Sequence, residues 1–510
     1  MKKVISFIDS HFNQIGYVCL CLFFVLFHFI LYTRQQLIID SDLSSEMVFA
    51  KLIADENSII SSNWFYSTEF RLFNMNLVLM PLFKIFNNWK LIRVFGTAIM
   101  NILMVVSFIF MAKKLKFRYI PWLSIFLCGA ISTEYYRFVT SSMCYTVYII
   151  VAFLTVGLIV SIVQDKNKLL SFVLLGILSF VASLNGIREL VVLSLPLFGT
   201  SVLFVIYYFV KKDEANRDVI YKLTGISIFV LLLSLAGLLV NKLVISANYM
   251  YMDYADSMHF GLYLSRIGDI VRGWFNLYGY EPVRYCSNIR FVLYPVFFFL
   301  VIFVIYCGIK ILLDKKYDVL HKYVSLLYFV SSAIVSAVFV LTDQYYQARY
   351  FIPCFVLFIA VLGVYFKYSE FKFNNIIVLI LTAYVGAVSM VCSLTYVARN
   401  NYDMLEVNDI LAARALEAGY TTFWEGNVLT ELSNGKIEAY VLKDDSSEIY
   451  KWLQKKDHFE NSVIDGEVFL LIESEDEYRD RMKEYQLYEG DDVLLYVFPD
   501  YTYVSKYYGE

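Results

Sequence analysis

The chain has 510 residues, of which 59% are hydrophobic and 18% aromatic, and its mean hydropathy is +0.59. This much apolar surface excludes a water-soluble globular fold, and the recurring apolar runs predict a polytopic α-helical membrane protein. The formal net charge of −3 conceals an asymmetry: residues 399–510 hold 11 Lys and Arg against 25 Asp and Glu, or −14, which leaves +11 for residues 1–398. The two parts are therefore expected to face different surroundings.

The first apolar run covers residues 15–31, and no small-residue cleavage site follows it. It is therefore predicted to remain as an uncleaved first transmembrane helix. Lys2 and Lys3 precede it and place the N-terminus in the cytoplasm by the positive-inside bias. The polar stretch 34–71, rich in carboxylates, is then an outer loop.

The segment 72–89 is apolar but broken by Asn, Pro and Lys, so we expect a juxtamembrane or half-inserted outer helix. Residues 91–112 then run inward and deliver the basic cluster 113–118 to the cytoplasm. The remaining spans are predicted near 119–133, 139–163, 169–184, 190–210, 222–245, 291–313, 323–341, 351–366 and 376–397. About eleven crossings result. Residues 1–398 form the transmembrane region, and the C-terminus lies outside.

Residues 399–510 are typical of a soluble domain, and we expect a small extracytoplasmic α/β domain there. Apolar strands bounded by turn residues and polar helices indicate this fold class. The predicted elements are a helix near 403–418, a β-like segment from Gly419, a turn at 433–436, strands at 437–442, 468–474 and 493–498, and a helix at 476–485.

Carboxylates in the first outer loop are the first candidate site residues. Asp42 and Glu46 lie four residues apart. An apolar stripe of Leu43, Met47, Ala50 and Ala54 predicts that the segment after Asp42 is an amphipathic helix on the membrane. The alternative is that Asp42 caps that helix, while Asp40 and Glu46 are only solvated. Glu69 is either a second functional carboxylate or a surface residue paired with Arg71.

Basic residues near the ends of later spans are the second group of candidates. Arg349 and Tyr350 lie at the edge of one span, and Arg137 and Arg188 occupy tight outer turns. A guanidinium there can bind a phosphate at headgroup depth. Equally, an arginine snorkels and a tyrosine belongs to the interfacial aromatic belt. No histidine or cysteine spacing predicts a metal site.

With these residues in view, the chain resembles the GT-C superfamily, in its branch of protein O-mannosyltransferases and lipid A aminoarabinose transferases. The likeness covers the membrane region. It lies in Asp40 followed six residues later by Glu46, a further acid at Glu69, a proline-containing juxtamembrane segment and a late ARYFIP. The chain has Asp-Ser-Asp for the family's Asp-Glu pair, so the base is Asp40 or Asp42. It also has Met80-Pro81 for a Pro-Pro pair.

The resemblance implies an inverting glycosyltransferase that takes a sugar from a polyprenyl-phosphate donor in the cell envelope. Asp40 or Asp42 would be the base, Glu46 would contact substrate, and Glu69 would bind acceptor or an optional divalent metal. Arg349 and Tyr350, with Arg137 or Arg188, would hold the phosphate. The expected partners are the lipid donor, membrane lipid and a glycan, lipid or protein acceptor, with no nucleic acid.

Transport is the rival function, as a lipid-linked-glycan flippase or a solute carrier. Such proteins usually keep ionisable residues within their spans. The predicted spans here are nearly free of them. A non-catalytic membrane scaffold ranks third.

The orientation is testable by cysteine labelling in intact cells. Single cysteines at Lys166, Lys316 and Lys372 should resist an impermeant thiol reagent, because these loops are predicted to be cytoplasmic. Cysteines at Ser257 and Ser447 should react. Labelling at Lys316 with protection at Ser447 would reverse the whole orientation.

Overall fold

The computed structural model describes residues 10–68, 70, 72–164, 168–212, 214–249, 258–285, 289–398, 401–444, 446–476 and 478–508. The chain divides into two compact units. The helical unit consists of Met1–Ile30, Ala98–Leu243 and Tyr254–Leu394. The α/β unit consists of Leu31–Thr97, Val244–Asp253 and Thr395–Glu510. The acidic C-terminal segment therefore belongs to the same unit as the first predicted outer loop.

Nine helices among the described residues are long and apolar enough to cross a membrane. Six of them are single helices: α2 (Phe12–Ile38), α5 (Trp89–Lys114), α8 (Thr146–Gln164), α15 (Arg290–Leu313), α16 (Val319–Leu341) and α19 (Asn374–Thr395). The other three are continuous runs of shorter pieces. They are η2 (Leu190–Ser194) with α10 (Leu195–Lys211); η3 (Glu214–Asn216), α11 (Arg217–Val240), η4 (Asn241–Ile245) and α12 (Ser246–Asn248); and η6 (Ala348–Phe351), α17 (Ile352–Phe355) and α18 (Phe358–Tyr368). The prediction of a polytopic helical membrane protein is confirmed, but the count of about eleven spans is not.

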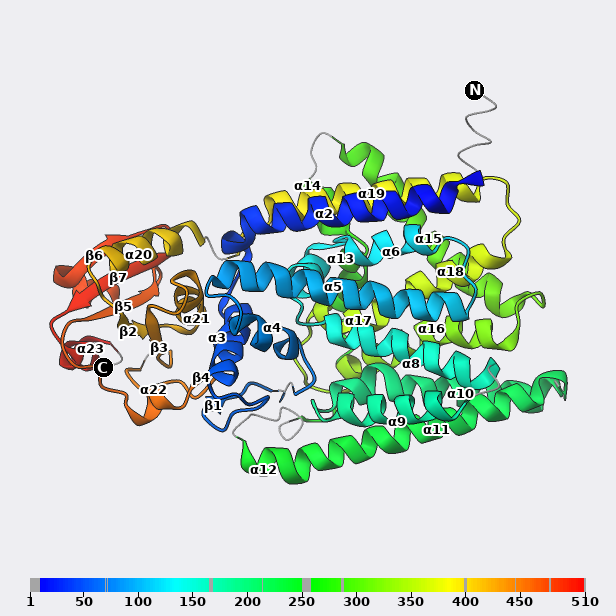
Figure 1. The fold of residues 1–510 in the computed structure, drawn as a ribbon, viewed down its shortest axis with the longest axis horizontal. Coiled ribbons are helices and arrows are strands. Elements are labelled where there is room, and N and C mark those ends of the chain that lie inside the picture. Colours follow the sequence, from blue (N-terminus) through cyan, green and yellow to red (C-terminus); the bar gives the residue numbers. More distant parts are fainter. Residues whose placement is uncertain are drawn as a thin grey trace. The chain divides into compact units, whose positions relative to one another are not determined.

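Two predicted spans form shorter helices. The span expected at 119–133 becomes α6 (Ile120–Cys128), and the one at 169–184 becomes α9 (Leu169–Ser183). At 1.5 Å per residue, α9 is about 22 Å long, less than the ~30 Å of a bilayer core. It lies alongside α11 (Figure 1). Further short helices in this unit are α7 (Thr133–Tyr135), η1 (Tyr136–Thr140), α13 (Arg266–Leu277) and α14 (Tyr280–Tyr285).

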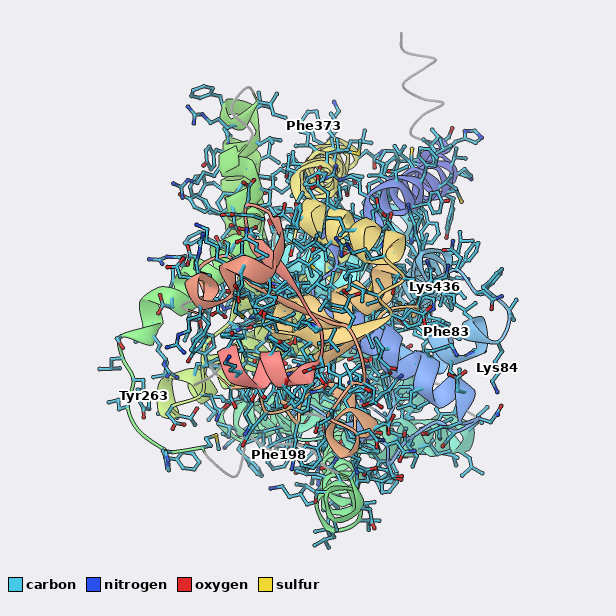
Figure 2. The ribbon with its side chains drawn as sticks, turned by 90° about the vertical axis from the view of Figure 1, so that its left-hand side faces the viewer. Phe83, Lys84, Phe198, Tyr263, Phe373 and Lys436 are labelled. Atoms are coloured by element: carbon cyan, nitrogen blue, oxygen red, sulfur yellow. The ribbon has the colours of Figure 1, made fainter. Side chains whose placement is uncertain are left out.

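Apolar side chains cover the outside of the helical unit. Leu22, Val25 and Ile302 are 66%, 68% and 65% exposed. Phe373 also projects outward from its ribbon (Figure 2). Exposed apolar surface of this extent is what a lipid-facing surface requires.

A five-stranded mixed sheet forms the centre of the α/β unit, in the order β3-β2-β5-β7-β6. Strand β2 pairs in parallel with β3 and β5, while β7 pairs antiparallel with β5 and β6. The elements are α20 (Asn401–Ala413), β2 (Ala418–Thr421), α21 (Phe423–Leu432), β3 (Glu438–Val441), β4 (Gln454–Lys455), α22 (Asp457–Glu460), β5 (Val468–Glu473), η7 (Arg479–Tyr485), β6 (Gln486–Glu489), β7 (Val493–Phe498) and α23 (Tyr501–Tyr507).

Strands β5 and β7 are buried on both faces, which explains their unbroken apolar sequence. On one face, Phe469 and Leu471 pack with side chains of α20 and α21. On the other face, Leu470 and Ile472 pack with Val504 of α23. The predicted C-terminal α/β fold is therefore confirmed.

Local predictions in this region had mixed outcomes. The three apolar strands are confirmed, and so is the turn, where Asn434 and Gly435 have φ of 57° and 76°. The helix expected at 476–485 is instead a 3₁₀ helix, η7. The β-like segment from Gly419 is a short strand followed by helix α21, which the sequence did not predict.

The first outer loop contributes helix α3 (Ser41–Asp55), which packs against α4 (Asn76–Phe83) and α21. Most of its residues are buried, on nearly every side of the helix. The expectation of an amphipathic helix lying on the membrane is therefore wrong, because protein surrounds α3. Strand β1 (Trp64–Phe65) also pairs antiparallel with β4.

Helix α4 is the structured part of the segment 72–89. Its eight residues span about 12 Å, which is too short to cross a bilayer. This agrees with the prediction that the segment 72–89 does not cross the membrane. Lys84 follows its last residue and lies at the periphery of the α/β unit, where it donates to Asn57 Oδ1 at 2.6 Å (Figure 2).

Candidate active site

Asp40 begins helix α3 as its N-cap. Its backbone is extended, with φ −132° and ψ 177°, and its Oδ1 accepts a hydrogen bond from Leu43 N at 3.0 Å. The side chain is only 2% exposed. A carboxylate in this position satisfies one of the free N–H groups of the first helical turn. The interpretation that gave the cap to Asp42 is wrong, because the helix begins at Ser41, two residues earlier than that interpretation assumed.

Asp42 and Glu46 lie one turn apart on the same side of α3. Asp42, in the first turn, is half-buried. Glu46 is 3% exposed and accepts a hydrogen bond from Asn76 Nδ2 of α4 at 3.0 Å. The space beside Glu46 is about 10 Å³, room for a single water molecule.

Aromatic rings close the surroundings of Glu46. Phe49 contacts Trp64 and Tyr66, each with a centroid distance of 5.4 Å, and Tyr66 contacts Phe70 at 4.9 Å. Among the described residues, these rings leave little space beside Glu46. Glu69, predicted as a second functional carboxylate, and Arg71 lie outside the described residues.

A buried ion pair fixes α3 to the C-terminal segment. Arg93 Nε and Nη2 donate to Glu431 Oε1 and Oε2, both at 2.6 Å, and Nη2 also donates to Leu43 O at 3.0 Å. Gln35 Nε2 adds a bond to Glu431 Oε1 at 3.1 Å. The side chains of Arg93 and Glu431 are 1% and 3% exposed.

The sequence analysis missed this ion pair. Arg93 lies within an apolar run, where an ionisable side chain should have drawn attention. Its partner lies 338 residues away, in the helix that the sequence did not predict. No local pattern joins the two residues.

The helical unit brings together the four predicted phosphate-binding residues. The Phe138 ring lies 4.7 Å from the guanidinium of Arg137 and 4.8 Å from that of Arg349. The Tyr350 ring lies 5.6 Å from Arg349 and 5.2 Å from Arg188. Three separate segments of the chain therefore form one arginine cluster, made of Arg137, Arg188 and Arg349.

The backbone at each arginine departs from a regular α-helix. Arg137 is in the π-helix η1, Arg188 lies just before the π-helix η2, and Arg349 is in the 3₁₀ helix η6. Such irregular turns often occur at functional sites. All three side chains are half-buried, where an ionic contact is less screened than in open water.

Glu134 of α7 is an acidic neighbour of Arg137 and Arg349. Burial raises the pKa of its carboxyl, and the guanidinium groups of Arg137 and Arg349 oppose that rise. Half-buried guanidinium groups with planar donors are suited to a phosphate.

The described residues contain no group of three or more His, Cys, Asp or Glu side chains arranged for a metal ion. Glu69, the carboxylate proposed as an optional metal ligand, is not among them. Binding of a divalent metal at Glu69 therefore stays a prediction from the sequence.

Solved structures resemble the fold, whereas two sequence comparisons found no match. No protein-family model matches the chain, and no curated protein matches it. ArnT from Cupriavidus metallidurans bound to undecaprenyl phosphate superposes with a TM-score of 0.58 and 8% identity, over 94% of this chain and 97% of that one. The chain has the ArnT fold. The apo state of ArnT gives a TM-score of 0.56, with the same identity and coverage.

The match to ArnT extends over nearly the full length of both chains, so it includes the membrane helices and the C-terminal sheet. The resemblance to the GT-C superfamily is confirmed at the level of the fold. At 8% identity, correspondence of individual residues does not follow from it.

Removing the charge of Glu431 should destabilise the ArnT-like fold strongly. In Glu431→Gln, Arg93 stays buried without a compensating charge, so the free energy of unfolding should fall by about 3–5 kcal/mol. Chemical denaturation of the purified protein measures the change.

The matched control is Glu448→Gln, which breaks an exposed ion pair with Lys443 and should change stability little. The double variant Arg93→Met/Glu431→Leu should recover part of the loss, because it leaves no unpaired buried charge. Equal stability of Glu431→Gln and Glu448→Gln would contradict the role given to the buried pair.

Proposed function

We propose that the protein is a membrane glycosyltransferase that transfers a sugar from a polyprenyl-phosphate donor to an acceptor hydroxyl. The observation that carries the proposal is the arginine cluster, a half-buried cationic site in a chain with the ArnT fold. One of the similar ArnT structures is bound to undecaprenyl phosphate, the lipid phosphate that remains when such a donor gives up its sugar.

The arginine cluster binds the donor phosphate. When the sugar leaves, the bond between its anomeric carbon and the phosphate oxygen breaks, and the phosphate keeps the electron pair. Guanidinium groups held against Phe138 and Tyr350 are already oriented, so they stabilise this developing charge without reorganising. Arg349 is central because it contacts both rings that link the cluster.

Asp42 is the general base. It takes the proton of the acceptor hydroxyl while that oxygen bonds to the anomeric carbon on the face opposite the phosphate, which inverts the configuration. Asp40 is less suited to this role, because its Oδ1 already caps α3 and its side chain is 2% exposed. Asp40 and Glu46 instead position α3, through Leu43 N and through Asn76.

The reaction takes place on the outer side of the membrane, with the N-terminus in the cytoplasm and residues 399–510 outside. The basic loops assigned to the cytoplasm support this orientation. The acceptor is a glycan, lipid or protein of the cell envelope. The lack of ionisable residues in most spans argues against transport.

Asp42→Asn should reduce transfer on the order of 10²–10⁴-fold while donor binding persists, because an amide keeps the shape but cannot accept the proton. Asp40→Ser should retain most activity, since serine also caps a helix. Transfer of radiolabelled sugar from polyprenyl-phosphate donors into lipid, polysaccharide and protein fractions measures both variants.

Inactivation by Asp40→Ser with full activity in Asp42→Asn would move the base to Asp40. Full activity in both Asp40→Asn and Asp42→Asn, at normal protein levels, would reject the transferase and favour transport.

Arg349→Ala should weaken donor binding as well as the rate. The loss of a charge-assisted contact should raise the donor KM on the order of ten- to a hundredfold. Arg349→Lys should restore only part of this loss, because the planar fork is missing. The control is Arg217→Ala, which removes an exposed arginine paired with Glu214. An unchanged donor KM in Arg349→Ala would exclude the arginine cluster as the phosphate site.

A further inference from the structure

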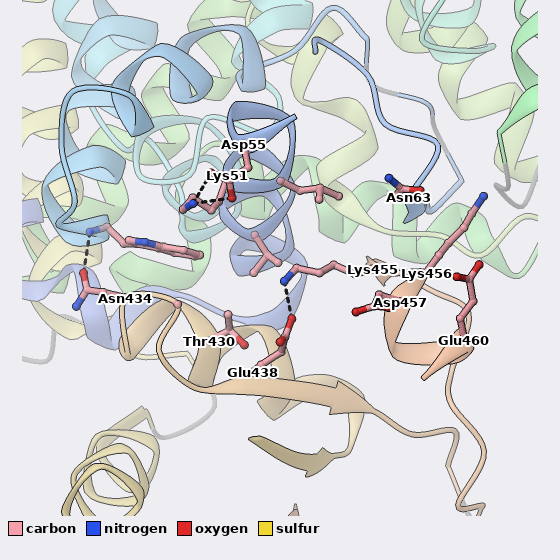
Figure 3. A pocket seen from close by; sticks show the side chains of 14 residues that line it. Lys51, Asp55, Asn63, Thr430, Asn434, Glu438, Lys455, Lys456, Asp457 and Glu460 are labelled. Carbon is pink, nitrogen blue, oxygen red and sulfur yellow. Dashed lines mark hydrogen bonds and ion pairs between the residues drawn. The ribbon is translucent and has the colours of Figure 1, made fainter. Parts of the chain in front are cut away.

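A second site lies within the α/β unit, at the end of α3 remote from Asp42. There a cavity of about 580 Å³ opens between the second half of α3, Trp89, the end of α21, strand β3 and helix α22 (Figure 3). Its volume is in the range of small-molecule binding sites. Neither the base nor the arginine cluster of the proposed transferase lines it.

The lining of this cavity is unusually polar. Most ligand pockets are predominantly apolar. Here ten of the fourteen lining residues are charged, amide or hydroxyl side chains. The charged ones are Lys51, Lys455, Lys456, Asp55, Glu438, Asp457 and Glu460. With three cations and four anions, the cavity has no positive excess for a phosphate and too little apolar surface for a lipid chain.

The cavity wall holds two ion pairs, each with a donor and an acceptor group. Lys51 donates to Asp55 at 2.5 Å, and Lys455 donates to Glu438 at 2.5 Å (Figure 3). Hydrogen bonds from His458 and Lys455 hold the pKa of Glu438 at about 2, so this residue remains an ionised acceptor at neutral pH. An ammonium has three donors and a carboxylate about four acceptor sites, so each pair keeps capacity for a ligand.

Two further charged side chains stand at one side of the cavity. Lys456 and Glu460 extend from the start and end of α22, on the side away from Lys51 (Figure 3). Val48, Leu52 and Trp89 supply a small apolar part of the wall. The backbone N–H of Trp89 donates to Asn434 Oδ1 at 2.8 Å, and the Trp89 ring packs so closely on Gly435 that no Cβ would fit there.

We propose that this cavity is a glycan-binding subsite. A sugar hydroxyl can both donate and accept hydrogen bonds, so it matches a wall that carries ammonium and carboxylate groups together. The carbon face of a sugar ring can rest on the small apolar part of the wall. The bound glycan is uncharged, since the wall carries nearly balanced charge.

Helix α3 carries both the proposed base, Asp42, and Lys51 of the subsite. Lys51 lies nine residues, or about 14 Å, along the helix from Asp42, and on the opposite face. A glycan in the cavity is therefore held at a distance from the base, as a distal part of an extended acceptor. This acceptor role rests on the proposed transferase, whereas glycan binding itself does not.

Isothermal titration of the full-length protein in lipid nanodiscs tests the subsite. Glycoside detergents are excluded because their sugar heads would compete. The probes are hexasaccharides of glucose, mannose, galactose and N-acetylglucosamine, with inorganic phosphate as an anionic comparison. At least one neutral hexasaccharide should bind, and phosphate should not. Lys456→Ala/Glu460→Gln should weaken the binding about tenfold, because two charged hydrogen-bonding groups are lost.

The matched control is Lys443→Ala/Glu448→Gln, which also removes one positive and one negative charge but lies outside the cavity. It should bind as the wild type does. The single variant Glu460→Gln, at an exposed residue, repeats the test if the double variant does not fold. Absence of binding by all four hexasaccharides, or equal binding by the cavity variants, would overturn the proposal.

Asp42→Asn separates the two claims. Its glycan binding should equal that of the wild type, so a failed transfer assay would not count against the subsite. Loss of glycan binding in Asp42→Asn would contradict a subsite that is independent of the base.

Discussion

The buried pair of Arg93 and Glu431 is the interaction on which the α/β unit depends. It joins four helices, because Gln35 of α2 bonds to Glu431 of α21 and the carbonyl of Leu43 of α3 bonds to Arg93 of α5. Removing two charges from water is costly, and a hydrophobic pair of the same volume is often at least as stable. We therefore infer that the ion pair contributes specificity of folding more than net stability, since its bidentate geometry fixes one arrangement of α2, α3, α5 and α21.

The ion pair also helps to hold the backbone beside the proposed base, through Leu43. Its N–H is bound by Asp40 Oδ1, and its carbonyl is bound by Arg93 Nη2. Both backbone groups of the residue next to Asp42 are thereby held, and one turn later Glu46 is held by Asn76. A general base must be placed accurately for a proton transfer to be efficient. The C-terminal segment, through Glu431, thus takes part in placing the proposed base.

The features that could be predicted from the sequence are those that depend on a local residue pattern. Most spans follow from long apolar runs, and the C-terminal strands follow from short apolar segments bounded by turns. The arginines could be selected because each lies at the edge of an apolar run. Their convergence could not be derived, since Phe138 and Tyr350 link segments about 200 residues apart.

Failures of the sequence analysis arose where tertiary contacts override local pattern. In Asp40-Ser-Asp42 two carboxylates compete for the same cap, and the packing of α3 decides between them. The aromatic residues around Phe423 favour a strand by propensity, yet the segment forms α21, whose inner face packs on the sheet. Residues 169–184 are apolar enough for a span but form a helix that is too short.

The most direct test of the account is a structure of the protein in lipid nanodiscs with undecaprenyl phosphate, determined by electron cryomicroscopy. The account predicts phosphate density within about 3 Å of the guanidinium of Arg349 and of at least one of Arg137 and Arg188. Phosphate bound away from all three arginines would contradict it.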